Sequence, residues 1–108
     1  MLRKITALAA MGAFLAAPAM AADKVKIGFV TTITTPAGVI GQDMVDAVNL
    51  AMEDIGGKMA GLDVELLIED DAFNPPIGKQ KVDKLVKKDN VDFIGGFIWS
   101  HVLLASKK

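Results

Sequence analysis

The segment VKIGFVT, residues 25–31, decides how the rest of the sequence is interpreted. It is short, apolar and rich in β-branched residues, and it is followed by a stretch rich in threonine, proline and glycine. Such a run is typical of a strand buried inside a sheet. Two further runs of this kind follow, LDVELLIE at residues 62–69 and VDFIG at residues 91–95. Together they predict a sheet that is covered on both faces.

Each predicted strand is followed by a segment with different character. Residues 32–41, TITTPAGVIG, are expected to form a loop, because proline and glycine interrupt regular elements. Residues 42–55 carry apolar side chains at helical spacing, and the glycine pair at 56–57 ends this helix. Residues 76–89 predict a second helix, and residues 100–106 begin a third.

The alternation of strands and helices predicts an α/β fold, a Rossmann-like βαβαβα unit with a parallel three-stranded sheet. A strand order of 2-1-3 would put the first strand in the centre. The loop at 32–41 and the loop at 96–100 would then face each other across a crevice. Open sheets of this class bind ligands in that crevice, beyond the carboxyl ends of the strands.

The first 21 residues have the pattern of a signal peptide. Arg3 and Lys4 form a positive start, residues 5–17 are apolar and uncharged, and residues 18–21 end in an A-x-A cleavage pattern. The apolar run is too short for a bilayer span, which needs roughly 20 residues. The alternative is a buried N-terminal helix, and the charge placement argues against it. We expect cleavage after Ala21 and export of residues 22–108.

Composition excludes several classes of partner for the exported part. All acidic residues lie in it, whereas Arg3 and Lys4 leave with the leader, so its net charge is weakly negative. Such a surface offers no footprint for nucleic acid or an anionic membrane. The sequence has no cysteine, which excludes disulfides and a lipoprotein anchor. Because no further apolar run follows, we expect no membrane insertion after cleavage.

The order of these motifs resembles a known family. KIGFVTTITTPAGVIGQDM at 26–44 and EDDAFNPPIGKQKVDKLVKKDNVDFIGG at 69–96 resemble the branched-chain amino-acid-binding proteins, which are periplasmic solute-binding proteins of ABC importers. FIGGFIWSHVLLAS at 93–106 resembles the family's ligand loop and the helix after it. The resemblance covers the whole exported part. It departs from the family at Thr34-Thr35-Pro36, where Ser-Gly-Pro is usual.

The resemblance implies that residues 22–108 form an incomplete first lobe of a type I periplasmic binding fold, whose members have two hinged lobes. It implies capture of a small carboxylated solute, of the branched-chain amino acid or aromatic acid class, in the periplasm. The partners implied are an ABC permease and ATPase, which act through the full-length protein. The alternative is the ligand-binding ectodomain of a receptor or sensor with the same fold.

Four residues are candidates for solute binding. Ser100 is expected at a helix start, where its hydroxyl and free backbone N–H groups can bind a carboxylate; the corresponding loop of the family holds that group. The alternative for Ser100 is a plain N-cap. Trp99 is expected to form an apolar wall, or else to pack within the lobe. Ile40 lies where the family often has an aromatic ring, and Thr34 is a candidate hydrogen-bond donor.

No catalytic or metal-binding set is expected, so the sequence does not indicate an enzyme. We expect the Asp70-Asp71 pair to tie a turn rather than to form a catalytic pair of acids. His101 is the only histidine, and without cysteine it cannot build a multi-histidine metal site. Glycine-rich phosphate loops are absent from the sequence, which argues against a nucleotide cofactor.

Overall fold

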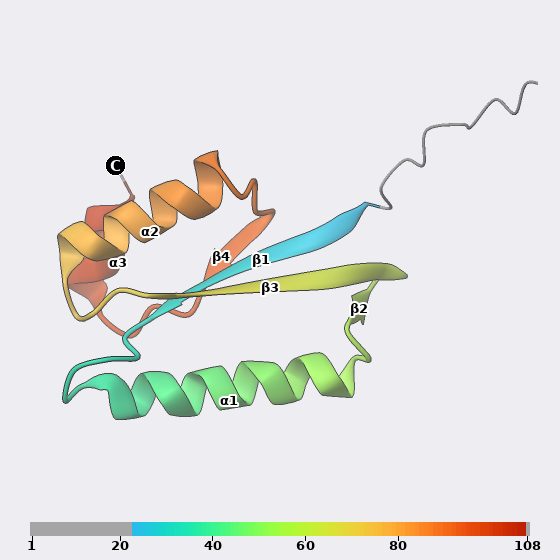
Figure 1. The fold of residues 1–108 in the computed structure, drawn as a ribbon, viewed down its shortest axis with the longest axis horizontal. Coiled ribbons are helices and arrows are strands. Elements are labelled where there is room, and N and C mark those ends of the chain that lie inside the picture. Colours follow the sequence, from blue (N-terminus) through green and yellow to red (C-terminus); the bar gives the residue numbers. More distant parts are fainter. Residues whose placement is uncertain (1–22, 108) are drawn as a thin grey trace, which may run out of the picture.

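A computed structural model describes residues 23–107 of the chain. The predicted signal peptide, residues 1–21, lies outside the described residues. Strands and helices alternate along the described part, and together they form one sheet with helices on both faces (Figure 1). The elements are β1 (Lys24–Thr31), α1 (Gly38–Asp54), β2 (Lys58–Met59), β3 (Leu62–Asp70), α2 (Pro75–Lys87), β4 (Phe93–Gly95) and α3 (Ser100–Ser106).

The sheet has the order β2-β3-β1-β4. Strand β1 is central among the parallel strands: it pairs with β3 from Lys24 opposite Asp63 to Thr31 opposite Asp70, and with β4 on its other edge. This confirms the predicted α/β class and the 2-1-3 order of the three predicted strands, with β2 added beside β3. As a result, β1, β3 and β4 all end at the same edge of the sheet, and their following loops share that edge.

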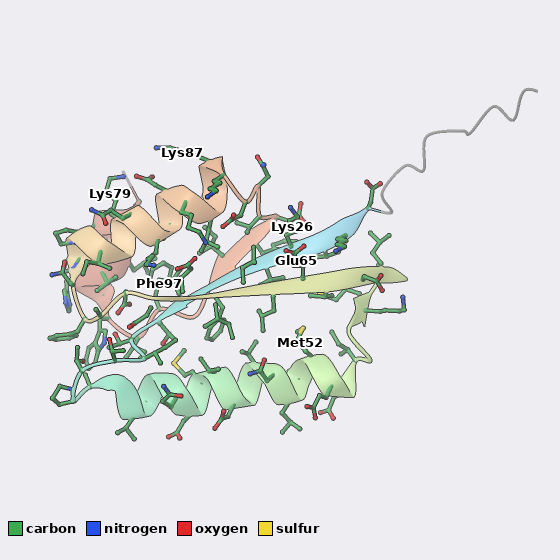
Figure 2. The ribbon with its side chains drawn as sticks, viewed as in Figure 1. Lys26, Met52, Glu65, Lys79, Lys87 and Phe97 are labelled. Atoms are coloured by element: carbon green, nitrogen blue, oxygen red, sulfur yellow. The ribbon has the colours of Figure 1, made fainter. Side chains whose placement is uncertain are left out.

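The two faces of the sheet are covered by different helices. Helix α1 lies along one face, and α2 and α3 lie together on the other (Figure 1). Met52 points from α1 toward the sheet (Figure 2). The apolar side chains with no exposed surface are Val30 of β1, Leu85 of α2 and Val102 of α3. The tightest packing of the described residues therefore involves the face that carries α2 and α3.

Strand β2 was not predicted, and the expected three-stranded sheet was incomplete in this respect. Lys58 and Met59 pair antiparallel with the start of β3, with Met59 opposite Leu62. Ala60 and Gly61 connect them with φ angles of 50° and 80°. Two successive positive φ angles match the twist of a tight hairpin. Gly61 is a usual signal for such a turn, but alanine at the preceding position is not.

The expectation that α1 begins at residue 42 was wrong, because the helix begins at Gly38. Gly38 and Gly41 do not interrupt it. A Cβ atom at Gly41 would lie 1.6 Å from the carbonyl oxygen of Thr32, and one at Gly38 would lie 2.1 Å from that of Ile33. The glycines therefore allow the first turn of α1 to lie directly against the backbone of the loop. They were interpreted as helix breakers, which is their more common role.

The other helix boundaries follow the usual chemistry of helix ends. Asn74 is the N-cap of α2, and its side chain accepts a hydrogen bond of 3.2 Å from the backbone N–H of Ile77. After α1, Gly56 and Gly57 adopt φ angles of 65° and 68°, as the sequence predicted for its C-terminal end. Among residues 23–107, no helix combines the length and the apolar character that a bilayer crossing requires.

Candidate functional site

Three loops meet at the carboxyl edge of the parallel strands. They comprise residues 32–37 after β1, residues 71–74 after β3 and residues 96–99 after β4. The backbone pairing of β1 and β3 continues into these loops, because the N–H of Asp71 donates to the carbonyl of Thr31 at 3.0 Å. Side chains from all three loops are joined there by a connected set of hydrogen bonds.

Asp70 holds the first loop against the end of β3. Its Oδ1 accepts hydrogen bonds of 2.9 Å from the backbone N–H groups of Ile33 and Ala72, and its Oδ2 accepts one of 2.5 Å from the hydroxyl of Thr34. Partial burial raises the pKa of Asp70, but these hydrogen bonds to the charged form outweigh it, so the pKa lies below the ordinary value of 3.8. Asp70 is therefore an ionised anchor of the loop.

Asp71 is fully buried and makes a second connection between the loop after β3 and the loop after β1. Its Oδ1 accepts a hydrogen bond of 2.5 Å from the hydroxyl of Thr32 and one of 2.9 Å from the backbone N–H of Phe73. The expectation that this acidic pair ties a turn is confirmed. Asp70 and Asp71 join the loop after β1 to the loop after β3; Asp71 is fully buried and Asp70 is partly buried.

Trp99 brings the third loop to the same place. Its indole Nε1–H donates a hydrogen bond of 2.9 Å to the hydroxyl oxygen of Thr32, which in turn donates to Asp71. The loops after β1 and β4 therefore converge, as the sequence predicted. The sequence left two roles open for Trp99, an apolar wall for the solute or packing within the lobe. Its half-buried side chain is compatible with both roles.

Ser100 is exposed and is the first residue of α3. The N-cap position belongs to Trp99, whose backbone carbonyl accepts hydrogen bonds of 3.1 Å from the N–H groups of Val102 and Leu103. The plain N-cap alternative for Ser100 therefore does not apply. The backbone N–H groups of Ser100 and His101 precede these first helical bonds, so the hydroxyl and these donors lie at the open start of the helix.

An aromatic cluster lies beside Ser100. The rings of Phe73 and Trp99 meet edge to face with centroids 4.8 Å apart, and the ring of His101 meets Phe73 at 5.2 Å. Phe73 is 45% exposed. The cluster is thus a surface feature, with the polar start of α3 directly next to it.

The other two candidates are Thr34, which lies in the loop after β1 as expected, and Ile40. Thr34 uses its single hydroxyl hydrogen in the bond to Asp70, so in this structure it supports the loop and has no donor left for a ligand. Ile40 was expected in a loop, which was wrong, because it lies in the first turn of α1. Its side chain is 51% exposed.

Two residues of the site were missed by sequence reasoning, Thr32 and Phe73. Thr32 resembles its neighbouring threonines in the sequence, and only the fold shows that its hydroxyl lies between Trp99 and Asp71. Ala72 and Phe73 adopt φ angles of 50° and 58°, which residues with bulky side chains rarely adopt. The preceding acidic pair gave a turn signal, but it did not specify where the Phe73 ring would point.

The chemistry of this edge is that of a binding surface. It combines hydroxyl and backbone N–H donors with an aromatic wall, which suits a small molecule that has an anionic end and an apolar body. Within residues 23–107, no group of three or more histidine, aspartate or glutamate side chains is arranged to hold a metal ion.

Solved structures similar to this chain include solute-binding proteins. An ABC transporter substrate-binding protein from Sphaerobacter thermophilus is 32% identical with a TM-score of 0.74, over 77% of this chain and 22% of its own. A solute-binding protein from Rhodopseudomonas palustris BisB5, in complex with 3,4-dihydroxybenzoic acid, is 28% identical with a TM-score of 0.74, over 77% and 23%. A leucine-binding protein from Thermotoga maritima MSB8 shares the fold at 23% identity, with a TM-score of 0.71, over 75% and 23%.

The chain thus spans less than a quarter of the length of these solved proteins. No curated protein sequence matches it. A family model described as periplasmic binding protein matches residues 24–108, which is nearly all of the part that the structure describes. The strand order, the convergent loops and these likenesses agree, and the chain belongs to the periplasmic binding protein family.

Proposed function

We propose that residues 22–108 supply half of a solute-binding cleft in the substrate-binding component of an ABC importer. The solute is a small carboxylate. Its anionic end lies at Ser100, where the hydroxyl and the first backbone N–H groups of α3 donate hydrogen bonds to it. Its apolar body lies against Trp99, with Ile40 as a more distant part of the wall.

One observation carries this proposal: the hydrogen bond of 2.9 Å between Trp99 Nε1 and Thr32 Oγ1. It joins the loops after β1 and β4 at the edge where sheets of this class bind ligands. It also leaves Ser100 exposed beside a fixed aromatic ring. If these loops diverged, the hydrogen-bond donors at Ser100 and the aromatic ring of Trp99 would lie at separate sites.

The solute class follows from the surface around Ser100. The rings of Phe73 and Trp99 offer edges and faces, and Ile33 and Ile98 add aliphatic side chains in the same loops. Such a wall accommodates a flat ring or a branched aliphatic chain, and we propose aromatic acids and branched-chain amino acids as the two classes to test. The binding of 3,4-dihydroxybenzoic acid by the similar R. palustris protein agrees with the first class.

The remaining parts of the proposal concern the whole protein. A second lobe closes over the solute and excludes water, and the closed form docks on a permease whose ATPase drives import. Residues 1–21 are a signal peptide that is cleaved after Ala21, and the protein acts in the periplasm as a binding protein rather than an enzyme. N-terminal sequencing of the exported protein should find Ala22 first.

The test is the affinity of the protein expressed from the complete reading frame, measured by isothermal titration calorimetry with benzoate and with L-leucine. We expect the Ser100→Ala variant to bind the better of the two about tenfold more weakly, because one hydrogen bond to a charged group contributes roughly 1.5–3 kcal/mol.

Ser106→Ala is the matched control. Ser106 lies in the same helix, six residues after Ser100, and its hydroxyl donates to the carbonyl of Val102 at 2.9 Å. We expect its affinity to equal that of the wild type. Equal affinities of the Ser100→Ala variant and the wild type would contradict the carboxylate role, and no binding of either probe would contradict both proposed solute classes.

A further inference from the structure

The buried carboxylate of Asp71 holds both aromatic rings of the site. Its Oδ1 accepts the hydroxyl hydrogen of Thr32, which fixes the indole of Trp99, and it also accepts the backbone N–H of Phe73. One oxygen atom is therefore connected to both members of the edge-to-face pair, although Asp71 itself has no exposed surface.

The backbone conformation of the loop after β3, residues 71–74, depends on this connection. Phe73 has a φ angle of 58°, and Ala72 before it has one of 50°. Non-glycine residues in this region are strained and persist only where surrounding contacts hold them. Asp70 accepts the N–H of Ala72 and Asp71 accepts the N–H of Phe73, so consecutive carboxylates hold consecutive strained residues.

The other oxygen of Asp71 indicates that stability alone does not explain this residue. Oδ2 is buried and has no hydrogen-bond partner among residues 23–107. A buried polar atom without a partner destabilises a fold, and such atoms are rare. Burying Oδ2 therefore lowers the stability of the fold, and the hydrogen bonds that Oδ1 accepts must offset this loss.

We propose that Asp71 is the positioning residue of the solute site, acting through Thr32 to set the orientation of Trp99 and directly on the loop to set that of Phe73. The role of the two rings in solute binding rests on the proposed function. The geometry of the rings can be tested without any solute. Asp71 does not touch the solute, and its effect on binding is entirely through the two rings.

The decisive variant is Thr32→Val, with Thr31→Val as its matched control. Both threonines are fully buried neighbours at the end of β1, and valine has nearly the same shape. The Thr31 hydroxyl faces the sulfur of Met44 at 3.8 Å and has no link to Trp99. Both changes remove one buried hydroxyl from adjacent positions, the last residue of β1 and the first residue of the loop after it, so a general structural effect would appear in both.

The primary measurement is the indole N–H resonance of Trp99 in protein expressed from the complete reading frame with 15N-labelled tryptophan, assigned with a Trp99→Phe variant. Without solute, we expect Thr32→Val to shift this resonance and to speed its exchange with water, and Thr31→Val to leave it unchanged. Thr32→Ser, which restores the hydroxyl, should return it to the wild-type position.

Asp71 itself is tested by two substitutions. Asp71→Ala should disturb the Trp99 resonance as Thr32→Val does, whereas Asp71→Asn keeps an acceptor oxygen and should preserve it. For solute, we expect Thr32→Val to weaken benzoate binding about fivefold, from the loss of an ordered aromatic wall.

The outcomes separate the two proposals. If Thr32→Val leaves the Trp99 resonance unchanged, or if Thr31→Val disturbs it equally, the positioning role is overturned. If the resonance responds as expected but neither benzoate nor L-leucine binds the wild type, the positioning of the rings stands and the proposed solute classes fail.

Discussion

The two ends of the sheet are held together in different ways. At the carboxyl end, the fully buried residues are Val30, Thr31, Thr32, Asp71 and Val102, and the hydrogen bonds there join three loops. At the other end, ion pairs open to solvent, such as Lys58 with Asp63, lie alongside hydrogen bonds between Lys26 and Asp92. Exposed apolar side chains accompany them, namely Ile55, Met59 and Leu62.

This difference shows that the interactions that fix geometry are concentrated at the carboxyl end of the sheet. Buried hydrogen bonds and close backbone contacts fix geometry, because any displacement leaves polar groups unpaired or atoms in conflict. Ion pairs between exposed side chains fix little, because water replaces them readily. The end that carries the proposed site is therefore expected to be the rigid end, and substitutions at the two ends should differ in their effect.

The largest effect is expected for Gly41→Ala. A Cβ atom there would lie 1.6 Å from the carbonyl oxygen of Thr32, and the conflict is with backbone that cannot rotate away. Alanine favours helices by about 1 kcal/mol over glycine, which offsets only part of the conflict. We expect the free energy of unfolding, from urea denaturation of the complete gene product, to fall by more than about 3 kcal/mol.

Gly95→Ala is the control for this substitution. Gly95 lies in β4, and a Cβ atom there would meet no other atom within 4 Å. We expect a change within about 0.5 kcal/mol. Equal stabilities of the Gly41→Ala and Gly95→Ala proteins would contradict the close contact between α1 and the first loop.

An intermediate effect is expected for Asp70→Asn. The charged form of Asp70 accepts three hydrogen bonds, and its loss should lower the free energy of unfolding by about 1 kcal/mol at pH 7. Since the pKa of Asp70 is lowered by folding, its contribution is complete above the ordinary value of 3.8 and is lost as the pH falls through the lower folded value.

Urea denaturation at pH 7 and at pH 2–3 measures this dependence. The difference between wild type and Asp70→Asn should be present at pH 7 and should shrink at the lower pH, where the wild-type carboxyl gains its proton. A difference that is the same at both pH values would show that the charge of Asp70 does not anchor the loop.

The smallest effect is expected for Lys58→Ala at the opposite end. Lys58 and Asp63 are 2.6 Å apart, and the pair lowers the pKa of Asp63 through this hydrogen bond. Both side chains are more than half exposed, so water screens their attraction. We expect no measurable change in the free energy of unfolding from urea denaturation. A shift as large as that of Asp70→Asn would remove the distinction between the two ends.

The sequence predicted the three parallel strands and their order, because each is a largely apolar run bounded by turn residues. It predicted less well where a tertiary contact changes the meaning of a residue. Gly41 was interpreted as a breaker, whereas its small size permits contact with Thr32. Lys58 and Met59 form a segment too short to show the alternation of apolar and polar residues that is typical of a strand. They form a strand only because β3 provides an edge for pairing.

For the site, the sequence indicated which loops converge but not which atoms meet. The exposed position of Ser100 at the start of α3 follows from the helix boundary, which the periodicity predicted. The connection from Trp99 through Thr32 to Asp71 depends on loop backbone angles, and Ala72 and Phe73 have no local preference for the angles they adopt. Such contacts arise from the assembled fold.

The most direct test of a solute cleft at the carboxyl edge is a titration of the 15N-labelled complete gene product with benzoate and with L-leucine. Backbone amide resonances are assigned at both ends of the sheet. We predict that the solute that binds will shift the amides of residues 32–34 and 96–101 and leave those of residues 58–63 unchanged. Shifts centred on residues 58–63, or spread equally over both ends, would contradict a solute cleft at the carboxyl edge.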